Sequence, residues 1–230
     1  MVKSHLKRFI TPTTWKIKRK GVKFIARPNP GAHPRSLSIP LSVVMKNMLK
    51  CAKTTREVKK LLKSNEILVD GRRFEEHCFP VGLMDVVSLK PSNEHYRVVF
   101  DEKGRLAALK IDAKEAKLKI SRVRKKTLLK GGKMQLNLSD SRNITIDKGD
   151  YKLGDSVVIE IPSQKIVNQF RLEKGASILL IAGKHIADSG IVEKAGAYVI
   201  IYKNEKGETK TTSRKYAFVT GKEKPALKIK

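Results

Sequence analysis

The chain has 230 residues, with 50 Lys and Arg against 22 Asp and Glu, and a formal net charge of +28. So much like charge repels itself in a compact fold, which predicts a polyanionic partner. The sequence shows no apolar run near the about 20 residues of a membrane-spanning helix, and no signal peptide. We therefore expect a cytoplasmic protein without a membrane partner, built from several small modules.

The cysteine and histidine content gives no sign of a bound group. Cys51 and Cys78 are too few for a disulfide framework in a chain of this length, which fits a reducing compartment. Together with His77 and His95 they show neither CxxC nor HxxxH spacing. We predict no metal site and no cofactor.

Residues 1–40 are predicted to form a basic, extended N-terminal arm. The first 56 residues hold fourteen Lys or Arg and no Asp or Glu. Large aromatic residues and a high density of proline argue against both a simple tail and one continuous helix, so we expect a segment that orders on binding. Trp15 either stacks on a base or packs against the folded domains. The candidate nucleic-acid-binding residues of the arm are Lys7, Arg8, Trp15, Lys16, Arg19 and Arg27.

Two amphipathic helices are predicted next. Apolar residues recur with a helical period over residues 41–49. Thr54 precedes Glu57 by three residues, a capping box that begins a second helix. Its core face is Val58, Leu61 and Leu62, and its opposite face carries only cations. A charged outer face is common on surface helices, but a face without acids is less so.

A hairpin and a further strand follow the second helix. Asp70-Gly71 between the strand-like runs 67–69 and 72–74 predicts a two-residue turn, and residues 86–89 predict a third strand. Placed beside the helix, this hairpin would complete a basic concave surface. The candidate binding residues are Lys53, Thr54, Arg56, Lys59, Lys60, Lys63, Arg72 and Arg73.

The rest of the chain is predicted to be rich in short strands. Residues 93–170 alternate strand-like runs with Gly, Asp and Asn turns, and residues 113–120 read as a helical stretch leading into the basic SRVRKK. Residues 171–230 add strands at 177–181 and 216–219, a loop containing Lys184 and a basic tail. The candidate binding residues here are Arg122, Arg124, Lys125 and Lys184.

Several of these motifs resemble known modules. AKTTREVKKLL, ILVDGRR and PVGLMDVVSL resemble the S4-type RNA-binding domain, and residues 177–192 resemble a KOW hairpin. HLKR, a tryptophan, ARPNPGAH and IPL are similar to the opening of the archaeal and eukaryotic S4e family of small-subunit ribosomal proteins. The chain departs from that family at Ala32, where Gly-Pro-His is usual, at Ser141, where Asp-Gly-Arg is usual, and in the KOW loop.

The resemblance implies a structural constituent of the small ribosomal subunit, with rRNA and neighbouring ribosomal proteins as partners and no homo-oligomer. The expected fold is α+β and multi-module: the arm, a two-helix-plus-sheet domain at 41–92, and two small β-barrel-like modules at 93–170 and 171–230. A ribosome-assembly or free RNA-binding factor stays an alternative. An RNA-modifying enzyme with the same domain is less favoured, because the aspartates after residue 111 that could serve as its catalytic group lie in or near predicted turns: Asp112, Asp140, Asp147, Asp150, Asp155 and Asp188.

Overall fold

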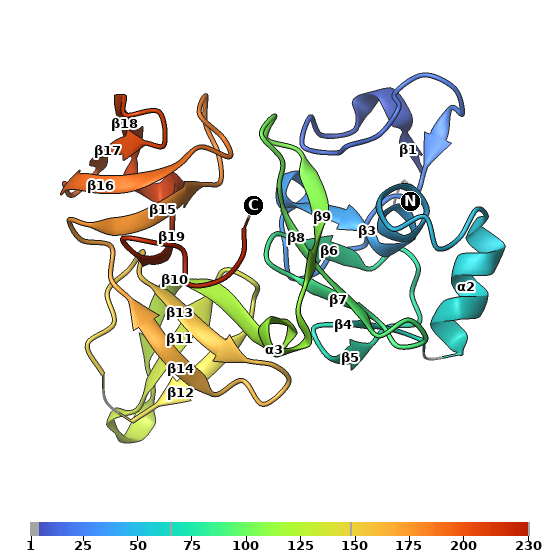
Figure 1. Cartoon of the computed structure of the whole chain (residues 1–230). Helices are drawn as coiled ribbons and strands as arrows, with labels where there is room; N and C mark the ends of the chain where they lie inside the picture. Colours follow the sequence, from blue (N-terminus) through green and yellow to red (C-terminus); the bar gives the residue numbers. More distant parts are fainter. Residues whose placement is uncertain (1–4, 65, 148, 230) are drawn as a thin grey trace. The chain divides into compact units, whose positions relative to one another are not determined.

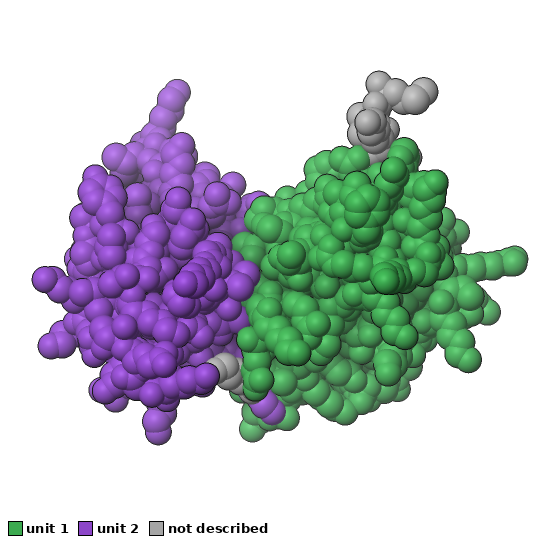
Figure 2. All heavy atoms as spheres, turned by 90° about the horizontal axis from the view of Figure 1, so that it is seen from above, with its two compact units in different colours: residues 1–117, 230 green, residues 118–229 purple. Residues whose placement is uncertain are grey.

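The computed structural model describes residues 5–64, 66–147 and 149–229; the first four residues of the predicted arm lie outside this description, as do residues 65, 148 and 230. The described chain consists mostly of β-sheets with few helices (Figure 1). It divides into two compact units, up to residue 117 and over residues 118–229, which Figure 2 colours separately. No helix among the described residues has the length and apolar character needed to cross a membrane.

Unit 1 contains a five-stranded sheet in the order β5-β4-β7-β8-β9 and two two-stranded sheets, β3-β6 and β1-β2. Its strands are β1 (Leu6–Lys7), β2 (Phe24–Ile25), β3 (Ser38–Pro40), β4 (Ile67–Val69), β5 (Arg72–Arg73), β6 (Pro80–Gly82), β7 (Val86–Leu89), β8 (Glu94–Phe100) and β9 (Leu106–Ile111). Its helices are α1 (Leu41–Val43), continued by the π-helical turn η3 (Val44–Met48), α2 (Thr55–Lys63), α3 (Ala113–Ala116), and the 3₁₀ turns η1 (Arg8–Ile10) and η2 (Arg35–Leu37).

Unit 2 contains two five-stranded antiparallel sheets, β12-β11-β10-β13-β14 and β18-β17-β16-β15-β19. The strands of the first are β10 (Leu118–Leu128), β11 (Met134–Leu138), β12 (Asn143–Ile146), β13 (Ser156–Glu160) and β14 (Ile166–Phe170). Those of the second are β15 (Ala176–Leu180), β16 (Ser189–Ala195), β17 (Val199–Asn204), β18 (Thr209–Ser213) and β19 (Ala217–Lys222). Two 3₁₀ turns, η4 (Lys130–Gly132) and η5 (Arg214–Tyr216), complete the unit.

The local signals around α2 are confirmed. Thr54 is the N-cap, and both hydrogen bonds of the capping box with Glu57 are present. Val58 and Leu62 are fully buried and Leu61 is half-buried. The predicted two-residue turn also forms: Asp70 and Gly71 both have positive φ, as a type I′ hairpin requires, and β4 pairs with β5.

Two elements differ from the sequence-based expectation. The predicted boundary at 92/93 lies between β7 and β8, which pair in one sheet, so β8 and β9 extend the sheet of unit 1. The predicted helix over 113–120 is wrong in its second half: α3 ends at Ala116, and 118–128 form the long strand β10. Pairing of β10 with β11 and β13 outweighs the local helical propensity of Leu118 and Lys119.

The N-terminal arm packs on unit 1, which corrects the expectation of a segment that orders on binding. Trp15 is 2% exposed, its Nε1–H donates to the carbonyl oxygen of Ser38 at 2.8 Å, and its backbone bridges to Leu106. The prediction of Trp15 as an RNA contact is therefore wrong, because both the ring and its one polar hydrogen are used inside the fold. Trp buries one of the largest areas of any side chain, so its burial makes a large contribution to stability.

A second contact holds the arm against β6 and the turn that follows it. His33 Nε2 lies 3.0 Å from Asp85 Oδ1, and Asp85 Oδ2 accepts the backbone N–H of Gly82 at 2.8 Å. The imidazole lies where a side chain at Gly82 would project, so a Cβ at that position would collide with the ring. Gly82 is therefore required here by close approach and not by an unusual φ.

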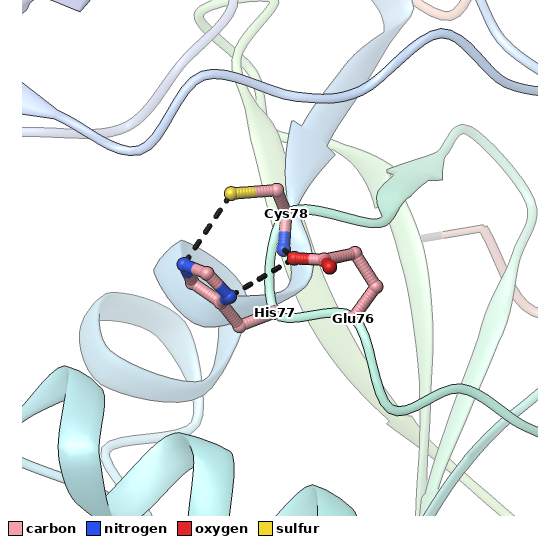
Figure 3. A group of neighbouring side chains, drawn as sticks. All are labelled: Glu76, His77 and Cys78. Carbon is pink, nitrogen blue, oxygen red and sulfur yellow. Dashed lines mark hydrogen bonds and ion pairs between the residues drawn. The ribbon is translucent and has the colours of Figure 1, made fainter. Parts of the chain in front are cut away.

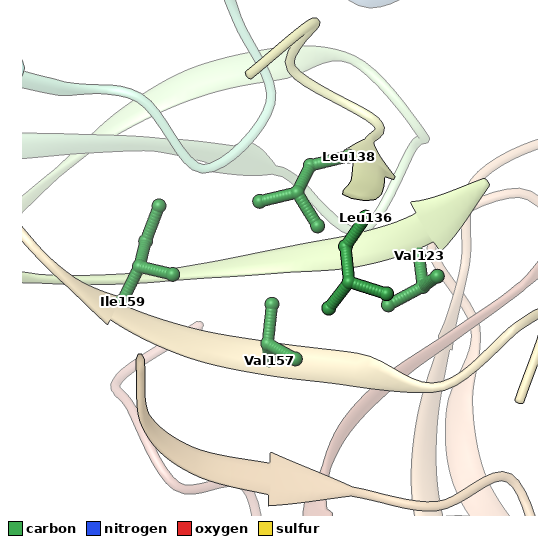
Figure 4. Close-up of a cluster of buried hydrophobic side chains, with 5 residues drawn as sticks. All are labelled: Val123, Leu136, Leu138, Val157 and Ile159. Atoms are coloured by element: carbon green, nitrogen blue, oxygen red, sulfur yellow. The ribbon is translucent and has the colours of Figure 1, made fainter. Parts of the chain in front are cut away.

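The first sheet of unit 2 has its own core. Val123, Leu136, Leu138, Val157 and Ile159 point toward one another from β10, β11 and β13 (Figure 4). The turn containing Asp140, Ser141 and Arg142 connects β11 to β12 without glycine, because Ser141 itself adopts a positive φ. The carboxylate of Asp140 in this turn is buried 3.3 Å from Lys119 Nζ.

The burial of Trp15 can be read from fluorescence because it is the single tryptophan of the chain. We expect a blue-shifted emission that resists acrylamide quenching and changes little when RNA is added. Trp15→Phe should lower the free energy of unfolding by about 1–3 kcal/mol, since the Ser38 carbonyl loses its buried donor. A solvent-exposed emission that RNA quenches strongly would contradict the packing described here.

The contact between Gly82 and His33 is open to a double-mutant cycle. Gly82→Ala should lower the free energy of unfolding by about 1–3 kcal/mol through overpacking. In a His33→Ala background the same substitution should cost much less, because the colliding ring is absent. Equal costs in the two backgrounds, measured by urea unfolding, would show that the imidazole is not the obstacle.

Candidate nucleic-acid interface

The outward face of α2 is a line of exposed cations. Arg56, Lys59, Lys60 and Lys63 form this line, and they border a shallow hollow of about 530 Å³ together with Thr54 and Glu57. Within the described residues no carboxylate forms an ion pair with these four. The arrangement follows from the helical period, which directs Val58 and Leu62 inward and the four cations outward.

The one acid on this helix is used at its N-terminus. The backbone N–H of Lys53 and the hydroxyl of Thr54 bind the Glu57 carboxylate and hold its pKa below the ordinary value. Glu57 thus serves the cap and the positive end of the helix dipole. The Thr54 hydroxyl, predicted as a binding group, is engaged in the same cap.

The arginine hairpin joins the C-terminal end of α2. Both Arg72 and Arg73 are exposed, as predicted. Arg73 Nη2 donates to the carbonyl oxygen of Lys63 at 2.9 Å and lies 2.8 Å from Glu75. The structure therefore connects the hairpin to the helix through a main-chain contact, while Glu75 offsets part of the charge of Arg73.

The arm residues serve two purposes. Arg8 donates to the Lys18 carbonyl oxygen at 3.0 Å, and Arg19 donates to that of Phe9 at 2.9 Å, so both guanidiniums brace the arm. Lys16 Nζ lies 3.9 Å from Asp101 Oδ2, a loose exposed pair. Lys7 is exposed and Arg27 is half-buried. The fold therefore positions the guanidiniums of Arg8 and Arg19 on the arm.

In unit 2 the basic SRVRKK lies on strand β10, with Arg122 half-buried and Arg124 and Lys125 exposed. Lys184 is exposed in the loop between β15 and β16. The same loop holds Asp188, which pairs with Lys210 at 3.3 Å and accepts from the Tyr202 hydroxyl at 3.2 Å. An acid so near reduces the net positive charge around Lys184.

Sequence reasoning missed three residues that the fold brings to Arg122 and Arg124. Arg214, Lys215 and Tyr198 line a hollow of about 630 Å³ with these arginines. The segments involved are about ninety positions apart, so no local pattern could have joined them. The local signal that the sequence offered was an aromatic residue, Tyr198, shortly after Gly196.

Glu76, His77 and Cys78 form a compact group of potential ligands in the loop before β6 (Figure 3). Glu76 Oε1 lies 3.0 Å from His77 Nδ1, and Cys78 Sγ lies 3.4 Å from His77 Nε2. Both imidazole nitrogens thus have partners within the group, so an ion bound to either nitrogen would replace one of these contacts. Burial raises the pKa of the Cys78 thiol, which disfavours the thiolate that metals bind. We assign no metal to it.

Known proteins resemble this chain over nearly all of its length. The model of ribosomal family S4e matches residues 92–166, and that of the RS4NT domain matches residues 2–36. The small ribosomal subunit protein eS4 of Methanocaldococcus jannaschii is 42% identical over 99% of this chain and 98% of its own. That of Methanosphaera stadtmanae is 39% identical over 99% of this chain and 96% of its own.

The solved structure of the 30S ribosomal protein S4e from Thermoplasma acidophilum agrees with these matches. It superimposes with a TM-score of 0.69 at 28% sequence identity, covering 81% of this chain and 96% of that one. Matching sequence along the chain, a matching fold and the basic surfaces described above lead to one conclusion: the chain belongs to the S4e family of small-subunit ribosomal proteins.

Proposed function

We propose that this protein is a structural constituent of the small ribosomal subunit that binds rRNA by neutralising phosphates with shape-fitted basic surfaces. Its partners are rRNA and neighbouring ribosomal proteins, its place is the cytoplasmic ribosome, and its role involves no catalysis. The observation that carries the binding mechanism is the α2 face, where four exposed cations lack carboxylate partners among the described residues.

The α2 face and the arginine hairpin form the first proposed rRNA surface. A folded protein gains nothing from a row of like charges on one helix, since they repel one another. A phosphate backbone removes that repulsion and releases counterions, which supplies most of the affinity in such contacts. We assign direct phosphate contacts to Lys53, Arg56, Lys59, Lys60, Lys63, Arg72 and Arg73.

Other surfaces complete the proposal. In the arm, Lys7, Arg8, Lys16, Arg19 and Arg27 offer charge on an already packed segment, so RNA need not fold it. Arg124, Lys125 and Lys184 add contacts in unit 2.

We retain the modular description as part of the proposal: the arm at 1–40, an S4-type RNA-binding domain at 41–92, a central β domain at 93–170, and a KOW-like module at 171–230. The last two would be small barrels. In support, α2 with its hairpin lies in unit 1 and unit 2 contains two separate five-stranded sheets, although β8 and β9 of the proposed central domain pair with the sheet of unit 1.

Sedimentation distinguishes a ribosomal constituent from an assembly factor. We expect the protein to co-migrate with mature small subunits in stoichiometric amount and to remain through a moderately high-salt wash. Recovery only at the top of the gradient, or only with immature particles, would reject the structural role and favour the alternative.

Replacing Arg56, Lys59, Lys60 and Lys63 together by Gln should weaken binding of the full chain to small-subunit rRNA. The slope of log K against log salt should become shallower by about 0.7–0.9 for each phosphate that the variant no longer neutralises. The thermal midpoint should change little, since all four side chains are exposed and have no ion-pair partner in the described part of the chain. Filter binding at several salt concentrations measures the slope.

A matched control removes the same formal charge elsewhere. Lys110, Lys133, Lys152 and Lys210 each lie within ion-pair distance of a carboxylate. Their joint replacement by Gln should change the slope much less than the α2 variant. Equal effects of the two variants would mean that net charge alone, and not the α2 face, determines binding.

A further inference from the structure

A groove of unit 2 has a composition that differs from the other basic surfaces. Its volume is about 630 Å³, and it is lined by β10, the loop before β13, the β16–β17 turn and the segment from β18 into η5. Its cations are Arg122, Arg124, Arg214 and Lys215, and its apolar members include Leu153 and Tyr198. It combines positive charge with an exposed aromatic ring.

Two guanidiniums converge on one point of this groove. Gly154 has φ +97°, and an ideal Cβ built on it would lie 3.7 Å from both Arg122 Nη2 and Arg214 Nε. The two cationic groups therefore approach the same small volume above the glycine backbone. Leu172 Cδ2 lies 3.3 Å from the same position, so a side chain at residue 154 would crowd this volume.

The cations of the groove have main-chain partners and, within the described ranges, no ion-paired acid. Arg122 donates to the carbonyl oxygens of Lys215 at 2.6 Å and Arg214 at 3.4 Å, and its Nε is buried without a partner among the described residues. Burial, followed by the charges of Arg124 and Arg214, lowers the pKa of Arg122. No carboxylate in the described ranges is ion-paired with the four cations. An anion entering the groove would relieve this repulsion.

The aromatic ring is presented on a fixed turn. Tyr198 is 86% exposed, and Leu153 across the groove is 53% exposed. The turn that carries Tyr198 is fastened to η5: the Arg214 N–H donates to the Tyr198 carbonyl oxygen at 2.8 Å, and Arg214 Nη1 donates to that of Gly196 at 3.1 Å. The arginine that faces the anion position thus also sets the position of the ring.

We propose that this groove binds an unpaired nucleotide of RNA, with its phosphate between Arg122 and Arg214 and its base stacked on Tyr198. The inference rests on the proposed rRNA binding and adds the type of RNA that this site takes. A base inside a regular duplex is stacked on its neighbours and cannot lie on a side chain, whereas loops and bulges offer splayed bases. An acidic peptide would satisfy the arginines but offers no flat ring for Tyr198.

The test compares two RNA hairpins that differ by one bulged uridine, using the full chain and fluorescence anisotropy. Other basic surfaces of the protein bind both probes alike, so the ratio of the two affinities isolates the groove. We expect the wild type to prefer the bulged probe. Tyr198→Ala should reduce that preference by about 10-fold, the usual scale of one base stacked on an aromatic ring, and Tyr198→Phe should retain it.

The contribution of positive charge in the groove is tested with Arg124→Gln. This side chain is exposed and donates to no described main-chain carbonyl oxygen, so its replacement should not disturb the fold. It should make the salt slope for the bulged probe shallower by about 0.7–0.9. Lys165→Gln removes an equal charge from an exposed site that does not line the groove, and should leave the preference unchanged.

Three results would overturn the inference: no preference of the wild type for the bulge, an unchanged preference in Tyr198→Ala, or displacement of the bulged probe by poly-glutamate as readily as by unlabelled bulged RNA. Each differs from a failure of the proposed function, in which the wild type would bind neither probe and would leave the small subunit in the salt wash.

Discussion

The rest of the structure depends on carboxylates that bind backbone N–H groups and buried cations inside the fold. The chain has few acids, and several of the best placed serve its own backbone. Asp85 accepts the Gly82 N–H, Asp155 accepts the N–H groups of Lys152 and Leu172, and Glu57 caps α2. Acids used in this way stabilise turns and helix ends. They are therefore unavailable to neutralise the cations outside.

Buried ion pairs use further acids inside the fold. Lys119 pairs with Asp140, and Arg97 pairs with Glu115, so two cations that the fold has buried receive carboxylate partners. The exposed cations on α2 receive none among the described residues, and the half-buried Arg122 and Arg214 in the groove of unit 2 donate to main-chain carbonyl oxygens. Because a buried unpaired charge costs far more than an exposed one, these two acids lie where folding requires them, while other acids pair with exposed lysines such as Lys133 and Lys152. The remaining positive charge is left for a partner that brings its own negative charge.

Local sequence patterns predicted local structure well. The capping box of α2, the Asp-Gly hairpin and the strand at Val86–Leu89 each depend on residues within a few positions of one another. Non-local features were beyond these patterns. The segment between β7 and β8 has the sequence of a domain boundary, but the two strands pair in one sheet. Burial of Trp15 requires contacts to Ser38 and Leu106, which lie far along the chain.

The candidate interface shows the same limit. The α2 face follows from one helical period, so sequence alone identified its four cations. The groove of unit 2 depends on Arg122 reaching the carbonyl oxygens of η5, ninety-two and ninety-three positions away. Sequence could offer Arg122 and Arg124 as a basic run, but not the aromatic turn that the fold places beside them.

Arginines that donate to main-chain carbonyl oxygens and lysines on α2 differ in how much side-chain freedom they lose when RNA binds. Arg8, Arg19, Arg122 and Arg214 donate to main-chain carbonyl oxygens, which fixes their side chains while leaving their full charge. Lysines on α2 keep their rotamer freedom until a phosphate arrives, and ordering each costs about 0.5–1.5 kcal/mol. Because a guanidinium has five donors, it can hold a carbonyl and still offer an N–H to a phosphate. The arginine sites are therefore suited to fixing the register of the RNA, and the lysine face of α2 to following a backbone whose local path varies.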